Sequence, residues 1–194
     1  AVAVLAVNDI DPYKLFKNVF PTKPIPIIAV PTTAGTGSEV TPYSILTRDD
    51  MKTKMSFGNE HTFPVVAFVD YRYTKSMPYE TTVSTAVDAL THAVEGYTSV
   101  RSTPFSDVIA KEVIRIFGKN KDSIINNNLD PRVREELLYM SMIAGFVISQ
   151  TGTTIVHAMG YSLTYFKDVS HGMANGVLLK EYLKSIYDHL KAKI

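Results

Sequence analysis

Cysteine is absent from this sequence of 194 residues. Without thiols the chain has no disulfide bonds and no zinc site of the cysteine type, so any metal ion must be held by histidine, aspartate or glutamate. A chain without disulfides fits an intracellular setting, and we expect a cytoplasmic protein. The metal ligands to look for are therefore imidazole nitrogens and carboxylate oxygens.

The sequence also lacks a surplus of charge of either sign. Its 20 lysines and arginines face 19 aspartates and glutamates, which gives a formal net charge of +1. The basic residues are scattered and form no run interleaved with aromatic residues, the pattern typical of nucleic-acid interfaces. We therefore expect neither a nucleic acid nor a membrane as a partner.

Long hydrophobic runs are missing as well. The longest run, AVAVLAV at residues 1–7, is far shorter than the roughly 20 residues that span a bilayer. No basic segment precedes it and the acidic NDID follows it, unlike a signal peptide. The chain starts without methionine and stops inside the amphipathic pattern KSIYDHLKAKI. We expect a piece of a longer polypeptide, truncated at both ends.

The residues that are present allow a sizeable core, since 45% are hydrophobic and 20% charged. In the first part of the chain, IPIIAV (25–30) and VVAFVD (65–70) have the pattern of buried strands. The segments EVTPYSILT and KTKMSF flank the polar turn RDDM and predict a hairpin. Residues 1–78 therefore predict an α/β part.

The second part of the chain has helical periodicity almost throughout. The segment 80–98 repeats apolar residues at helical spacing, and Thr103-Pro104 and Asp130-Pro131 are start signals for two further helices. A short helix is expected around His157, between two glycines, and a last one from about Gly172 to the end. Residues 79–194 therefore predict an all-α part.

Two polar residues interrupt the apolar run VDALTHAVEG, residues 87–96. Asp88 and His92 stand four residues apart, so their side chains leave one helix face with Cβ atoms about 6 Å apart. A pair of this kind is more often an ordinary hydrogen-bonded pair. The same separation suits two ligands of one metal ion.

The surroundings of the other histidines help to decide between a hydrogen-bonded pair and a metal site. His157 in TTIVHAMGY and His171 in DVSHGMANG have apolar or glycine-containing surroundings, whereas His61 and His189 have the polar surroundings of surface residues. A lone buried histidine is usually a satisfied core residue, but three with an aspartate favour a metal centre. Three imidazoles and a carboxylate suit iron(II) or zinc(II), in either a structural or a catalytic site.

The loop PTTAGTGSE, residues 31–39, follows the expected strand IPIIAV. Its small residues let backbone amides approach an anion, and its hydroxyls add hydrogen-bond donors. The order of strand, loop and strand excludes a Walker loop and a G-x-G-x-x-G fingerprint. By residue type alone, a tight turn and an anion-binding loop both remain open.

Taken in order, PTTAGTGSE, VDALTHAVEGY, TGTTIVHAMGY and HGMANG resemble the motifs of the iron-containing (group III) alcohol dehydrogenases. The resemblance covers nearly the whole chain. It implies a two-domain, dehydroquinate synthase-like architecture, with an N-terminal α/β dinucleotide-binding domain, a C-terminal all-helical metal domain and the active site in the cleft between them.

The resemblance also implies roles for individual residues. It implies that the metal ligands are Asp88, His92, His157 and His171. It implies that Thr32, Thr33 and Thr36 contact the dinucleotide, NAD or NADP. Lys54 is implied to reach the ribose of the same cofactor. Glu39 and Glu95 belong to the motifs without an assigned role.

The chain departs from the family pattern at two places. Many members carry a histidine four residues after the third ligand, where this chain has Tyr161. A phenol with a pKa near 10 is a poorer proton shuttle than imidazole, so no catalytic residue is assigned. The glycine-rich G-G-G-S motif for the pyrophosphate, expected before AVAVLAV, and the last C-terminal helices are absent.

These features predict a metal-dependent, NAD(P)-linked alcohol dehydrogenase or aldehyde reductase acting on a small alcohol or aldehyde, as a homo-oligomer, with a dimer preferred. One alternative is a related metal enzyme, such as a glycerol dehydrogenase or a dehydroquinate synthase-like lyase. Another is a metal-binding fragment without catalytic activity.

Overall fold

The computed structural model describes residues 1–188 and 191. Short elements come first: α1 (Val2–Leu5), the 3-10 helix η1 (Pro12–Lys17), β1 (Ile28–Ala29), η2 (Ser38–Val40), β2 (Ser44–Arg48), β3 (Thr53–Phe57), η3 (Glu60–Thr62), β4 (Val66–Ala67) and η4 (Tyr71–Thr74). Longer helices follow: α2 (Tyr79–Thr98), α3 (Pro104–Ile125), α4 (Pro131–Thr151), α5 (Ile155–Lys167) and α6 (His171–Ser185). The predicted order, an α/β part and then a helical part, is confirmed.

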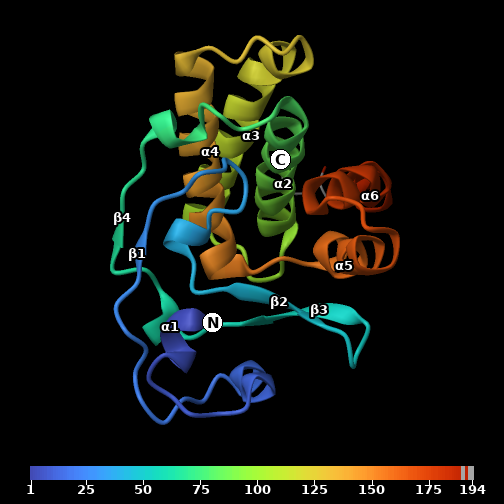
Figure 1. Cartoon of the computed structure of the whole chain (residues 1–194). Coiled ribbons are helices and arrows are strands. Elements are labelled where there is room, and N and C mark those ends of the chain that lie inside the picture. Colours follow the sequence, from blue (N-terminus) through green and yellow to red (C-terminus); the bar gives the residue numbers. More distant parts are fainter. Residues whose placement is uncertain (189–190, 192–194) are drawn as a thin grey trace.

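Figure 1 shows α2, α3 and α4 side by side, with α6 against the side of α2, α5 against α6, and the hairpin of β2 and β3 below the helices. The 3-10 helix η2 packs against α4, so the two parts of the chain are in direct contact. The division into domains at residue 78 stays a prediction, and His189 lies outside the described residues.

Local start signals place two of the helices. The hydroxyl of Thr103 accepts a hydrogen bond from the N–H of Ser106 at the start of α3, and Asp130 accepts one from the N–H of Val133 at the start of α4. Each cap is followed by a proline at the first helical position, where no N–H is needed. Both predicted starts are confirmed.

The main core lies between α2, α3 and α4. The α2 face in this core is built of alanines, Ala86, Ala89 and Ala93, all fully buried, which lets the neighbouring helices approach closely. Larger side chains from α3 and α4 fill the remaining space, each contributing about 1.5–3 kcal/mol when fully buried. They include Val113, Leu137, Leu138, Met140 and Val147. This packing holds α2, the helix that carries Asp88 and His92, in a fixed position.

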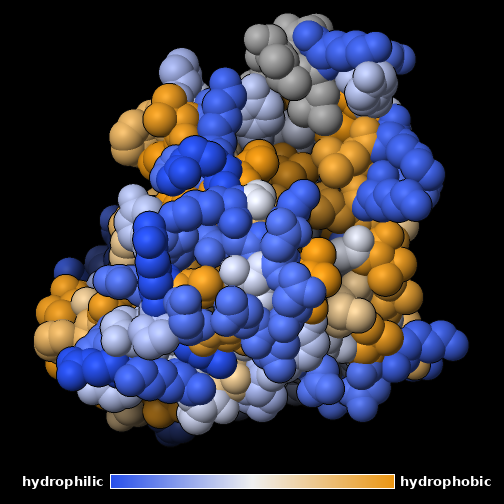
Figure 2. All heavy atoms as spheres, turned by 90° about the horizontal axis from the view of Figure 1, so that it is seen from above, coloured by the Kyte–Doolittle hydropathy of each residue, from blue (hydrophilic) through white to orange (hydrophobic). Residues whose placement is uncertain are grey.

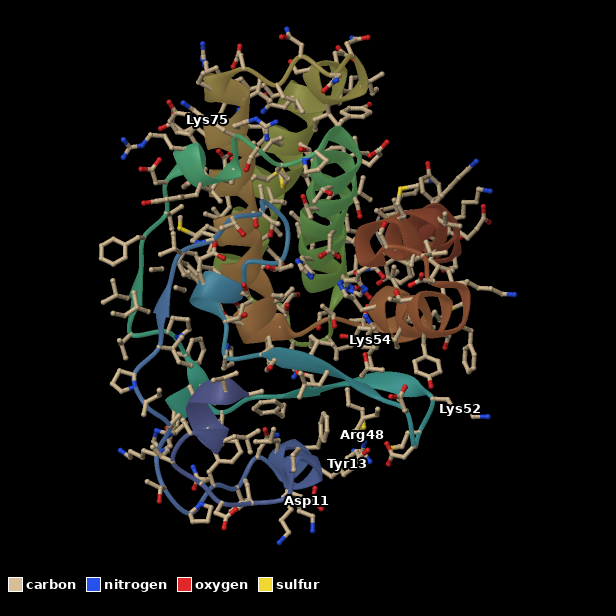
Figure 3. The ribbon with its side chains drawn as sticks, viewed as in Figure 1. Asp11, Tyr13, Arg48, Lys52, Lys54 and Lys75 are labelled. Atoms are coloured by element: carbon tan, nitrogen blue, oxygen red, sulfur yellow. The ribbon has the colours of Figure 1, made fainter. Side chains whose placement is uncertain are left out.

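The predicted hairpin is confirmed, with β2 and β3 antiparallel from Ser44 opposite Phe57 to Arg48 opposite Thr53. Arg48 at its tip joins the hairpin to η1, as Figure 3 shows. Its guanidinium lies 4.7 Å from the ring centre of Tyr13 and 2.6 Å from Asp50. The hairpin is therefore attached to the N-terminal segment by a cation–π contact.

The prediction of buried strands at 25–30 and 65–70 is wrong in extent and in burial. The strands β1 and β4 pair in parallel over two residues each. Ile28 is 63% exposed and Phe68 58% exposed. A parallel strand is buried, and apolar on both sides, only where other layers of the protein cover both faces of its sheet. No other strand of the described residues pairs with β1 or β4.

No single helix among the described residues has both the length and the hydropathy to span a bilayer. The helices α4 and α5 meet that criterion only as a pair, and they are bent by 111° relative to each other. Figure 2 shows the face seen from above, where polar side chains separate the apolar ones into patches.

Candidate metal centre

Four predicted ligands from three helices meet at one point. Asp88 and His92 come from α2, His157 from α5, and His171 begins α6. Oδ1 of Asp88 lies 3.5 Å from Nε2 of His157 and 3.8 Å from Nε2 of His171. Oδ2 of the same carboxylate lies 4.0 Å from Nε2 of His92. A single carboxylate therefore faces three imidazoles.

The cluster fits a metal ion by its geometry and its donor atoms. Ligand atoms of Asp88, His92 and His157 all lie within 4.8 Å of one another, and all three residues are buried. The Nε2 atom of His157 is buried and makes no hydrogen bond. With His171, whose side chain is 32% exposed, the set offers three nitrogens and a carboxylate oxygen, which suits divalent iron or zinc.

The charges within the cluster are unequal. Burial raises the pKa of Asp88, but the imidazoles of His92, His157 and His171 outweigh burial and hold that pKa well below its usual value. Burial lowers the pKa of His92 to about 4, against the opposing effect of Asp88. The carboxylate is therefore ionised and His92 neutral at pH 7, the forms in which they bind a metal.

The other two histidines differ from each other. Burial lowers the pKa of His157, but the nearby carboxylates of Asp88 and Glu95 outweigh burial and raise that pKa to about 9. Burial lowers the pKa of His171. A metal ion must therefore displace a proton from His157 but finds His171 mostly neutral at pH 7.

Two residues around the cluster were not predicted as part of the site. Asn175 on α6 donates a hydrogen bond of 2.9 Å to Oδ1 of Asp88. Glu95 on α2 contacts Nδ1 of His157. Its carboxyl is buried, which raises its pKa, but His157 and Thr154 outweigh burial and lower it. One signal was available, because Asp88, His92 and Glu95 form a polar stripe at helical spacing in an otherwise apolar run.

The four residues of the cluster line part of a cavity of about 400 Å³. Tyr161 also lines this cavity, and its ring stacks on that of His171 at 5.5 Å. Burial and the charges of Asp88 and Glu95 raise the pKa of Tyr161 to about 12, so its phenol stays protonated. Further lining residues include Thr36, Ser38, Tyr43, Ile45, Arg101 and Ile148.

The residues predicted to bind the cofactor are only partly brought to this site. Thr36 lines the cavity, and its hydroxyl donates to that of Ser38 at 3.2 Å. Lys54 on β3, labelled in Figure 3, lies near enough for its charge to contribute to the lowered pKa of His171. Thr32 and Thr33 are not among the lining residues. The cofactor contacts of all four residues stay predictions.

Comparison with known families matches both parts of the chain. The profile described as iron-containing alcohol dehydrogenase matches residues 1–71. The profile described as the C-terminal region of the Fe-containing alcohol dehydrogenase family matches residues 82–194. Together the two matches cover the loop 31–39 and all four residues of the cluster.

Individual relatives agree with these profiles. Alcohol dehydrogenase 4 of Schizosaccharomyces pombe is 35% identical over 160 residues, which are 82% of this chain and 38% of that protein. The 1,3-propanediol dehydrogenase of Klebsiella pneumoniae is 35% identical over 92% of this chain and 46% of its own length. The chain therefore spans less than half the length of these curated relatives.

Solved structures show the same fold. An iron-containing alcohol dehydrogenase from Thermotoga maritima superposes with a TM-score of 0.85 at 47% identity, covering 92% of this chain and 49% of that one. Sulfoacetaldehyde reductase from Bifidobacterium kashiwanohense, solved with NAD+, gives a TM-score of 0.88 at 34% identity, covering 96% and 50%. The chain belongs to the iron-containing alcohol dehydrogenase family.

Proposed function

We propose that this chain is the metal-binding part of an NAD(P)-linked alcohol dehydrogenase, which acts as an aldehyde reductase in the reverse direction. The observation that carries the proposal is that Asp88, His92, His157 and His171 meet in the wall of a cavity large enough for a small substrate. The names of the relatives support it, since they include alcohol dehydrogenases, a 1,3-propanediol dehydrogenase and a sulfoacetaldehyde reductase.

Iron(II) or zinc(II) at these ligands would polarise the oxygen of an alcohol or an aldehyde, and the nicotinamide of NAD or NADP would exchange the hydride. The ionised carboxylate of Asp88 supplies the negative charge that offsets a divalent ion. Burial of Asp88 and His92 keeps water from these two ligands, which strengthens electrostatic interactions at the site.

Tyr161 has a limited part in this reaction. Its phenol lies beside His171 at the cavity wall and keeps its proton at neutral pH. A protonated phenol can donate a hydrogen bond to a substrate oxygen, but it is a poor acceptor for the proton of an alcohol. We assign Tyr161 to orienting the substrate and not to proton transfer.

Turnover by the metal-loaded protein, expressed at the full length of its reading frame, tests the proposal. Absorbance at 340 nm follows NADH or NADPH with ethanol, 1,3-propanediol, glycerol and the matching aldehydes. We expect hydride transfer that Asp88→Asn abolishes and His61→Ala leaves unchanged, since His61 lies in η3, outside the cluster. Activity confined to glycerol would indicate the glycerol dehydrogenase alternative. Stoichiometric metal without any turnover would indicate a non-catalytic protein.

The remaining partners belong to the same proposal. We propose a cytoplasmic homodimer that acts on a small molecule and binds neither nucleic acid nor a membrane. The net charge of +1 and the scattered basic residues support the last two points. Light scattering after gel filtration measures the assembly, and fractionation of cells measures the location.

A further inference from the structure

The carboxylate of Glu95 joins two helices at the edge of the metal centre. Glu95 lies on α2 and is fully buried. Its Oε1 accepts hydrogen bonds from the N–H of Thr154 at 2.9 Å, the hydroxyl of Thr154 at 2.6 Å and the N–H of Val156 at 2.8 Å. Its Oε2 contacts Nδ1 of His157. Both carboxylate oxygens are thus occupied by α5 and the residue that precedes it.

These partners explain how a buried carboxylate is tolerated. The N–H groups of Thr154 and Val156 belong to the start of α5, where backbone donors have no partners within the helix. The helix dipole adds a partial positive charge at the same end. A carboxylate can accept every one of these hydrogen bonds, whereas a neutral side chain of the same shape cannot.

The contact with Nδ1 determines which nitrogen of His157 is available. A carboxylate accepts a hydrogen bond, so Nδ1 must carry the proton, and the lone pair of the neutral ring is then on Nε2. Nε2 is the atom that faces Oδ1 of Asp88 at 3.5 Å, inside the cluster. Histidine ligands of metals commonly depend on such a carboxylate for their orientation and tautomer.

We propose that Glu95 is a positioning residue for the metal ion, which holds His157 with Nε2 directed into the cluster and fixes the start of α5 through the same carboxylate. The proposal rests on the proposed metal centre. Glu95 itself is not a ligand, because both of its oxygens are already engaged away from the cluster.

Glu95→Gln tests the proposal with almost no change of shape. The amide oxygen of glutamine must face the three donors at the start of α5, so its NH2 group faces His157. Nδ1 must then accept a hydrogen bond, which moves the proton to Nε2 and blocks the nitrogen that would bind the ion. We expect the Kd for Zn2+, measured by competition with a chromogenic chelator, to rise about 10- to 100-fold.

Two further variants separate positioning from a general loss of structure. Thr154→Val removes one donor to Oε1 but keeps the carboxylate on His157, so we expect lower thermal stability with a Kd within about twofold of the parent protein. Glu39→Gln makes the same chemical change at another buried carboxyl, in η2, and should leave the Kd unchanged. A purely structural role predicts instead that Thr154→Val and Glu95→Gln weaken metal binding alike.

Proton NMR of the cobalt(II)-substituted protein supplies a second readout. The N–H protons of histidine ligands give shifted, exchangeable resonances, and we expect Glu95→Gln to remove or displace one of them. If Glu95→Gln does not fold, Glu95→Asp keeps the charge on a shorter arm and should raise the Kd to a smaller degree.

An unchanged Kd and spectrum in the folded Glu95 variants would overturn the proposal while leaving the metal centre intact. A parent protein that binds neither zinc nor cobalt would overturn the metal centre itself.

Discussion

The imidazole rings of His92 and His157 stack face to face, with centres 4.7 Å apart and planes 17° apart, although they come from α2 and α5. Their Nε2 atoms face the two oxygens of one carboxylate. Nε2 of His92 lies 4.0 Å from Oδ2 of Asp88, and Nε2 of His157 lies 3.5 Å from Oδ1. The ring of His171 meets His157 edge to face at 5.1 Å. The three imidazoles are therefore directed at one position, where a metal ion would bind.

Replacing His171 with alanine should sharply reduce the metal bound per chain. The change removes one of four donors and leaves a partly exposed gap beside Asp88. Elemental analysis of the dialysed protein measures the stoichiometry, and His61→Ala serves as the control for loss of a histidine at the surface. Retention of one full equivalent of iron or zinc by the variant would show that His171 is not a ligand.

Metal binding should stabilise the folded chain. An ion that binds only the native state at 100 times its Kd adds about 2.7 kcal/mol to the free energy of unfolding. For a chain of this size that is a rise in Tm of about 5–10 °C. Thermal melts with zinc and after chelation measure the rise. Asp88→Asn should abolish it, and an equal rise in that variant would contradict the site.

Gly152 should be intolerant of a side chain, in contrast to Gly118. Gly152 has φ of +65° and ψ of −177°, a region that is essentially restricted to glycine, and an added Cβ would lie 2.1 Å from Nη2 of Arg101. We expect Gly152→Ala to lower the free energy of unfolding by about 1–3 kcal/mol.

Gly118 lies inside α3 with nothing within 4 Å of an added Cβ, so Gly118→Ala should raise stability by about 0.5–1 kcal/mol. Urea titrations of both variants test the pair. An equal change in the free energy of unfolding for Gly152→Ala and Gly118→Ala would contradict a difference in backbone strain between the two positions.

Glu136 should contribute stability that depends on pH. The Lys119 ammonium and the Asn120 amide lower the pKa of the Glu136 carboxyl to about 2, below its ordinary 4.5. A pKa lowered by folding stabilises the native state above pH 4.5, and this contribution is lost as the pH falls towards 2.

The Glu136 side chain is 23% exposed and its partner Lys119 is 45% exposed, so solvent screens the pair and the gain at pH 7 is modest, about 0.5–1 kcal/mol. The difference in unfolding free energy between the parent and Glu136→Gln should therefore shrink between pH 7 and pH 3. A difference that is constant with pH would contradict the ion pair.

Features with local causes were predictable from the sequence. Thr103 and Asp130 mark helix starts because a cap needs only a side chain and the next turn of backbone. The hairpin of β2 and β3 was predictable for the same reason, since its strands are neighbours along the chain. Helical spacing relates only Asp88 to His92, whereas His157 and His171 were candidates through their apolar or glycine-containing surroundings, and the family motifs supported the complete set.

Features that depend on contacts distant in sequence were not predictable. The role of Glu95 requires the position of α5, and nothing near Glu95 along the chain indicates that helix. Gly160 was expected to end a short helix, yet α5 continues to Lys167. A Cβ at Gly160 would lie 2.1 Å from Oδ1 of Asn175, so glycine is needed there for close packing of α5 against α6.

The ligands of the cluster are distributed along the chain from Asp88 to His171, on helices that are separated in the sequence by α3 and α4. An ion at this position would therefore act as a crosslink across a long loop, and the unfolded chain cannot form it in advance. Metal uptake should then be a late event in folding. A chain that folds without metal would present a nearly complete binding site, whereas one that has lost its helical core would present only separate, weak ligands.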